Sequence, residues 1–150
     1  VFAWHALAWQ PWRAMRPGLL AVLHLSYAWL PLAFVLYALQ DVIYASRGEM
    51  LFYRAPLHAL AIGYFGSMLV AMVTRVTMGH SGRPLQMGAL PWVCFGLLQV
   101  VALLRIRAEF SGDVDRWLVL AACGWLLAFL PWVLRSLWIY ATPRLDGKPG

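Results

Sequence analysis

The chain has 150 residues, of which 63% are hydrophobic, 15% aromatic and only 12% charged. A soluble globular domain carries about twice that share of charge, so the composition argues against an ordinary soluble enzyme and favours a membrane protein. The net charge of +6 does not indicate nucleic-acid binding, because the twelve basic residues are scattered over loops and helix ends without forming a basic run.

Four long apolar runs predict four helices that cross a lipid bilayer. Residues 1–17 hold several tryptophans and arginines and are expected to form an interfacial N-terminal segment. The transmembrane region is expected over residues 18–140, and residues 141–150 form a polar C-terminal tail. The predicted fold class is therefore all-α, a polytopic transmembrane helical bundle. Its four predicted spans cover about residues 18–39, 56–78, 86–105 and 117–140.

The second span has the clearest internal pattern. From Pro56 to Met78 it is about 23 residues long, or roughly 34 Å of helix, which is enough to cross a bilayer core of about 30 Å. Small residues recur at every fourth position, a spacing that lets two membrane helices approach closely. The stripe of small residues consists of Ala59, Gly63, Ser67 and Ala71.

The number of spans places both ends of the chain on one side of the membrane. Outside the spans, basic residues are equally numerous on the two sides, but Arg75 and Arg135 lie near the helix ends of the side that holds the chain ends. The excess of positive charge on the cytoplasmic side then favours cytoplasmic chain ends. Because the chain begins at Val1 and not at methionine, we expect a piece of a longer protein whose remaining spans are its partners.

Histidines are the first candidates for chemistry, because an ionisable group within a span is costly and commonly functional. Chain direction brings His24 and His80 toward the same side of the membrane, whereas His58 lies near the opposite surface. Imidazole is a ligand for haem iron and copper, and methionine sulfur suits copper(I). The spacing therefore predicts two sites, one shared by His24 and His80 and one at His58.

Each candidate has a plainer interpretation beside it. A membrane histidine can simply hydrogen-bond a neighbour, such as Tyr27 one turn from His24. Arg75 or Arg83 is expected to neutralise a haem propionate, but Arg75 can equally extend toward lipid headgroups. The chain has no CxxCH motif, which excludes covalently attached haem, and no paired-carboxylate or nucleophile–base pattern that would predict an enzyme.

Three blocks of the sequence resemble the NnrS family, in the same order along the chain. They are Leu23 to Trp29, Leu57 to Leu60 together with Met72 to Pro84, and Thr142 to Gly150. The resemblance implies a bacterial inner (cytoplasmic) membrane protein of about twelve spans that binds b-type haem and copper. It also implies a role in nitric oxide metabolism or nitrosative-stress protection, with nitric oxide or a related species as partner. His24, His58 and His80 stand at the family-type metal-binding positions.

Two other classes of function stay open. One is a segment of a transporter or channel, in which Arg75, His58 and Thr74 line a polar pathway. The other is a membrane anchor subunit without catalytic function, whose helices only assemble a larger complex. A Soret band from purified protein would favour the haem protein, and a colourless protein that moves a solute in vesicles would favour the transporter. In every case the lipid bilayer is an expected partner and nucleic acid is not.

Overall fold

The computed structural model describes residues 4–5, 8 and 18–147, and this part of the chain is built from helices without β-strands. Helix α4, the π-helix η1 and helix α5 follow one another without a break, so the described chain has four long helices. All four are long and apolar enough to cross a membrane, which confirms the predicted all-α bundle. The elements are α3 (Gly18–Arg47), α4 (Ala55–His58), η1 (Ala59–Gly66), α5 (Ser67–His80), α6 (Ala89–Ala108) and α7 (Val114–Ala141).

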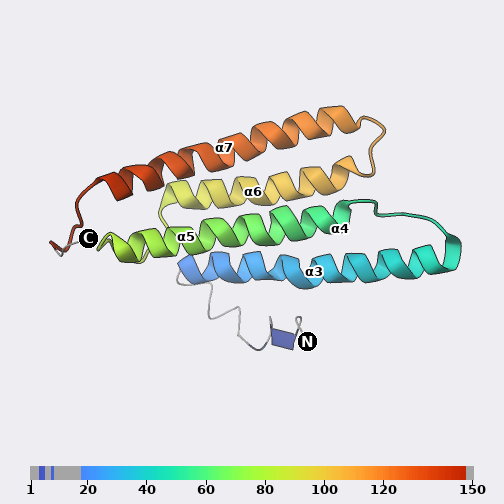
Figure 1. The fold of residues 1–150 in the computed structure, drawn as a ribbon, viewed down its shortest axis with the longest axis horizontal. Coiled ribbons are helices and arrows are strands. Elements are labelled where there is room, and N and C mark those ends of the chain that lie inside the picture. The colour runs from blue at the N-terminus through green and yellow to red at the C-terminus, as the bar shows by residue number, and fades with distance from the viewer. Residues whose placement is uncertain (1–3, 6–7, 9–17, 148–150) are drawn as a thin grey trace.

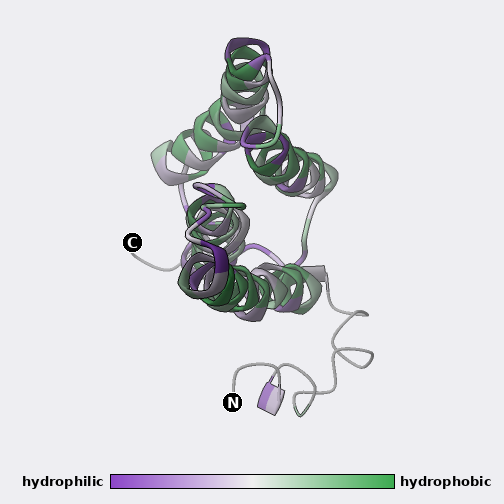
Figure 2. Ribbon diagram, turned by 90° about the vertical axis from the view of Figure 1, so that its right-hand side faces the viewer, coloured by the Kyte–Doolittle hydropathy of each residue, from purple (hydrophilic) through white to green (hydrophobic). Residues whose placement is uncertain are grey.

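The four long helices lie side by side in the order α3, α4–η1–α5, α6 and α7 (Figure 1). Most of each helix body is hydrophobic, as the end-on view shows (Figure 2). We call the end of the bundle that holds the turn of residues 81–88 and the tail of residues 142–147 the tail side. The opposite end, with residues 48–54 and 109–113, is the far side. The interfacial segment expected over residues 1–17 falls almost entirely outside the described residues.

Helix α3 runs to Arg47, although the sequence predicted its end near residue 39. Gln40 is buried, and its amide holds the segment that follows the helix. Its Oε1 atom accepts a hydrogen bond from the Phe52 backbone N–H (2.7 Å), and its Nε2 atom lies 3.2 Å from the Met50 sulfur. A polar residue thus fastens the connection while the helix continues past it.

Helix α7 begins at Val114, three residues before the predicted start. Asp113 is its N-cap, since a carboxylate oxygen of Asp113 accepts a hydrogen bond from the Arg116 backbone N–H (3.3 Å). This interaction satisfies one of the free N–H groups in the first helical turn. Charged residues that precede the predicted start of the span therefore belong to the helix.

The stripe of small residues is a buried helix contact, as predicted. Ala59, Ser67 and Ala71 have no exposed surface, and Gly63 is buried as well. A Cβ atom at Gly63 would overlap the indole ring of Trp29, so the absence of a side chain lets α3 pack directly onto η1.

Candidate functional site

His24 lines a cavity of about 630 Å³ beside α3. The Nδ1 atom lies 3.0 Å from the Leu20 carbonyl oxygen one turn earlier, so Nδ1 carries the proton in this hydrogen bond. A neutral imidazole protonated at Nδ1 keeps the lone pair of Nε2 for accepting a hydrogen bond or ligating a metal. The lining residues are Leu20, Leu23, His24, Tyr27, Tyr64 and Met68.

The opposite wall of this His24 cavity comes from the irregular part of the second span. Tyr64 belongs to the π-helix η1 and Met68 to the first turn of α5. Tyr64 also packs edge-to-face against Tyr27 of α3, with ring centroids 6.5 Å apart. π-Helical turns occur often at functional sites. The cavity thus combines an imidazole, a thioether and two phenol rings within apolar walls.

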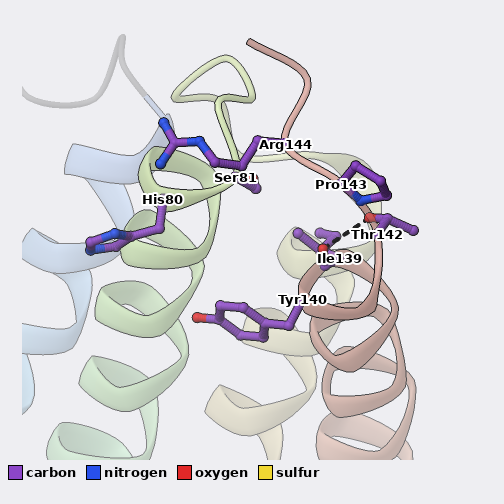
Figure 3. A pocket seen from close by; sticks show the side chains of 7 residues that line it. All are labelled: His80, Ser81, Ile139, Tyr140, Thr142, Pro143 and Arg144. Carbon is purple, nitrogen blue, oxygen red and sulfur yellow. Dashed lines mark hydrogen bonds between the residues drawn. The ribbon is translucent and has the colours of Figure 1, made fainter. Parts of the chain in front are cut away.

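His80 does not share this cavity. It is exposed at the end of α5 and lines a different pocket, formed with the end of α7 and the tail (Figure 3). Met68 and His80 are twelve residues apart, or about 18 Å along the helix, and His24 lies beside Met68. The structure therefore does not bring His24 and His80 together, because α3 starts alongside the middle of α5 and not alongside its end (Figure 1).

His58 lies at the far side in a cluster of charged groups, which we call the far-side cluster. Its Nε2 atom lies 3.1 Å from the Glu109 Oε1 atom and 3.1 Å from the Arg105 Nη2 atom. The second carboxylate oxygen of Glu109 accepts a hydrogen bond from the Arg54 backbone N–H (3.3 Å). Side-chain exposure is low, at 11% for His58 and 15% for Glu109.

The contacts of this cluster limit what His58 can do. A guanidinium only donates and a carboxylate only accepts, so Nε2 accepts from Arg105 when it is unprotonated and donates to Glu109 when it is protonated. In both states Nε2 is engaged, and the arrangement does not fit a metal ion held at this atom. The sequence analysis did not predict the contact of Arg105 and Glu109 with His58. The order of the spans could have indicated this contact, since the start of span two and the end of span three lie on the same side of the membrane.

The comparison with known families decides which group of proteins this is. A family model described as NnrS protein matches residues 1–144. The chain belongs to the NnrS family. The match covers all four spans and all the predicted site residues, which confirms the resemblance seen in the sequence. Neither a curated protein nor a solved structure matches the chain.

Two arginines were further candidates in this NnrS-family chain. Arg75 is exposed on α5, and Arg83 lies in the turn after α5, where its Nη2 atom donates to Thr142 Oγ1 (3.1 Å). Neither residue lines the His24 cavity. The polar pathway considered for a transporter is not assembled by its three residues either, because Thr74 is buried and accepts a hydrogen bond from Trp132 while Arg75 is exposed.

No group of three or more histidine, cysteine, aspartate or glutamate side chains is placed to hold a metal ion among the described residues. The two cysteines fit this result, since Cys94 is buried in the apolar core and Cys123 is exposed on the outer face of α7. His24, a nitrogen donor, and Met68, a soft sulfur donor, line the same cavity.

Proposed function

We propose that this chain is part of an integral protein of the bacterial inner membrane that binds haem and copper and acts in nitric oxide metabolism or nitrosative-stress protection. Membership of the NnrS family and the four membrane-length helices support the proposal. The observation that carries it is the His24 cavity, where an imidazole and a thioether line one apolar space.

The residues of the His24 cavity fit a haem group. A volume of about 630 Å³ lies within the range of roughly 300–1,000 Å³ that ligand pockets occupy. Histidine and methionine are the usual axial ligands of electron-transferring haem proteins, and a hydrogen bond such as that from Nδ1 to Leu20 orients a ligating imidazole. Haem held by these two residues would supply an iron centre that accepts and donates electrons. The rings of Tyr27 and Tyr64 restrict access to the space next to His24.

The other family-type histidines stand apart from this cavity. His80 is exposed at the tail side. Within the described residues, it belongs to no group of three histidine, cysteine, aspartate or glutamate side chains that could hold a metal ion. We infer that a copper ion held by His80 takes its further ligands from outside these residues. His58 acts through Glu109 and Arg105, as a hydrogen-bonding group of the far-side cluster.

The test is an absorption spectrum and a metal analysis of the purified full-length protein. We expect a Soret band that His24→Ala abolishes and that Met68→Leu shifts, because the leucine keeps the volume and removes the sulfur. Met72→Leu is the matched control, since Met72 is exposed one turn further along the same helix and should leave the spectrum unchanged. An unaltered haem spectrum in His24→Ala would contradict the assignment. A colourless wild-type protein that moves a solute in vesicles would support the transporter instead.

A further inference from the structure

One ring nitrogen of the far-side cluster lies between two opposite partners. The Nε2 atom of His58 is 3.1 Å from the Glu109 Oε1 atom, which only accepts hydrogen bonds, and 3.1 Å from the Arg105 Nη2 atom, which only donates them. A ring nitrogen carries either a lone pair or a proton, so it satisfies one of these neighbours at a time. The protonation state of the imidazole therefore selects its partner.

The charges that act on His58 come from both sides of the α4–α6 contact. Arg105 lies in the last turn of α6, Glu109 is the C-cap of that helix, and the guanidinium of Arg54 just before α4 repels a positive ring as well. The π-helix η1 contains no charged residue. Helix α3 also packs against α4, and its charged residues Asp41 and Arg47 are exposed and do not act on the ring. Two guanidinium groups thus surround the ring together with a single carboxylate.

Burial makes this balance of charge sensitive to one added proton. The His58 and Glu109 side chains are only 11% and 15% exposed, so water screens their charges poorly. Glu109 also accepts a hydrogen bond from the Arg54 backbone N–H (3.3 Å) and so holds the chain just before α4. A proton on the imidazole adds a third positive group around this one carboxylate. It also removes the lone pair to which Arg105 donates.

We propose that the far-side cluster is a pH-sensitive switch that fastens the start of α4 to the end of α6 while His58 is neutral and loosens this contact when the ring is protonated. In the neutral state the ring proton is on Nδ1, Nε2 accepts from Arg105, and Glu109 keeps the Arg54 N–H. In the protonated state Nε2 donates to Glu109, and Arg105 loses its acceptor and is repelled by the imidazolium. Histidine is the side chain that ordinarily changes charge between about pH 5 and 8. This inference does not depend on haem or copper.

The experiment compares the melting temperature of the purified full-length protein in detergent at about pH 7.5 and about pH 5.5. His58→Gln is the decisive variant, because the amide both donates and accepts but does not titrate, while every other titrating group is unchanged. On acidification the melting temperature of the wild type should fall by several degrees more than that of His58→Gln. His5→Gln makes the same substitution at an exposed histidine and should keep the pH dependence of the wild type.

A distance measurement locates the change. Spin labels are attached to Leu57→Cys of α4 and Leu103→Cys of α6, two exposed positions, in a protein with Cys94 and Cys123 replaced by alanine. The two labels should move apart on acidification when residue 58 is histidine and keep their separation in His58→Gln.

A purely structural role for the ring gives a different result. His58→Gln would then change the melting temperature equally at both pH values, and its pH dependence would equal that of the wild type. That outcome, or labels that do not move on acidification, would overturn the proposal. If His58→Gln does not purify as a folded protein, Arg105→Gln decides. Its amide still donates to the ring but carries no charge, so the acid-induced fall in melting temperature should be smaller than in the wild type, and an equal fall would overturn the proposal.

Discussion

Three histidines of similar apparent promise occupy three different environments at the residue scale. His24 faces an apolar cavity, His58 is held between a guanidinium and a carboxylate, and His80 is exposed at a helix end. These surroundings decide the chemistry open to each ring: Nδ1 of His24 donates to the Leu20 carbonyl oxygen, whereas Nε2 of His58 contacts both Glu109 and Arg105. The family sequence pattern contains all three histidines but does not distinguish their environments.

The far-side cluster makes a prediction at this scale. Glu109→Ala should lower the free energy of unfolding by about 1–3 kcal/mol, because His58 and the Arg54 N–H lose their acceptor and Arg105 loses a nearby negative charge. A thermal melt in detergent measures this effect, as a fall in melting temperature of several degrees. The matched control is Glu49→Ala, which removes an exposed carboxylate on the same side of the bundle. A melting temperature for Glu109→Ala equal to that of the control would contradict a structural role for the cluster.

Little of this side-chain pairing was predictable from the sequence. The sequence identified His24, His58 and His80 as residues of interest, since ionisable side chains stand out against apolar runs. It predicted His80 as the neighbour of His24, which is wrong. The relative positions of two helices along their axes depend on packing contacts between them, and the sequence does not show these contacts. The contact of Gly63 with Trp29 is one such contact. The four-residue spacing of small residues does not show which side chain packs against Gly63.

At the scale of the element, the second span is both a packing surface and part of the cavity wall. Its small residues face α3 and α6, while Tyr64 and Met68 face the His24 cavity. The existence of this span and its buried stripe followed from length, hydrophobicity and four-residue spacing, which are local properties. The π-helical stretch of Ala59–Gly66 did not, since its apolar residues fit a regular α-helix equally well.

Gly63→Leu tests the packing surface. The leucine side chain would have to displace the Trp29 ring, and forced overpacking of this kind costs about 1–3 kcal/mol of unfolding free energy. We expect a melting temperature several degrees lower, together with a changed tryptophan fluorescence spectrum. Gly96→Leu is the control, because a Cβ atom at this exposed glycine of α6 meets nothing within 4 Å. Equal stability of the two variants would show that α3 and η1 are not in close contact.

At the scale of the whole molecule, hydrogen bonds between helices fix the level at which each helix lies. The Gln99 amide links three of them, since Oε1 accepts from Trp29 Nε1 (2.7 Å) and Nε2 donates to Ser67 Oγ (2.7 Å). Trp132 Nε1 donates to Thr74 Oγ1 (2.9 Å) and joins α7 to α5. In an apolar medium a helix that slides leaves such groups without partners. These hydrogen bonds therefore fix the positions of the four apolar helices relative to one another along their axes.

That alignment places the two sides of the bundle in different compartments, and we predict that the tail side is cytoplasmic. Arg83 and Arg144 lie beyond the helices on that side, and Arg75 and Arg135 lie near the helix ends there. Carboxylates gather on the far side, but they contribute little to orientation, and Arg47, Arg105 and Arg107 end helices on the far side, so the two sides differ little in basic charge. The prediction concerns a small difference in charge, and a direct measurement of accessibility is the appropriate test.

Single cysteines in the two connecting turns provide that measurement, in a full-length protein with Cys94 and Cys123 replaced by alanine. Gln86→Cys lies in the exposed tail-side turn, and Gly112→Cys lies in the exposed far-side turn. In intact cells a membrane-impermeant maleimide should label Gly112→Cys and leave Gln86→Cys unlabelled until the membrane is opened. Equal labelling after lysis is the control for reactivity. Labelling of Gln86→Cys alone in intact cells would reverse the orientation and place the tail side on the outer face of the membrane.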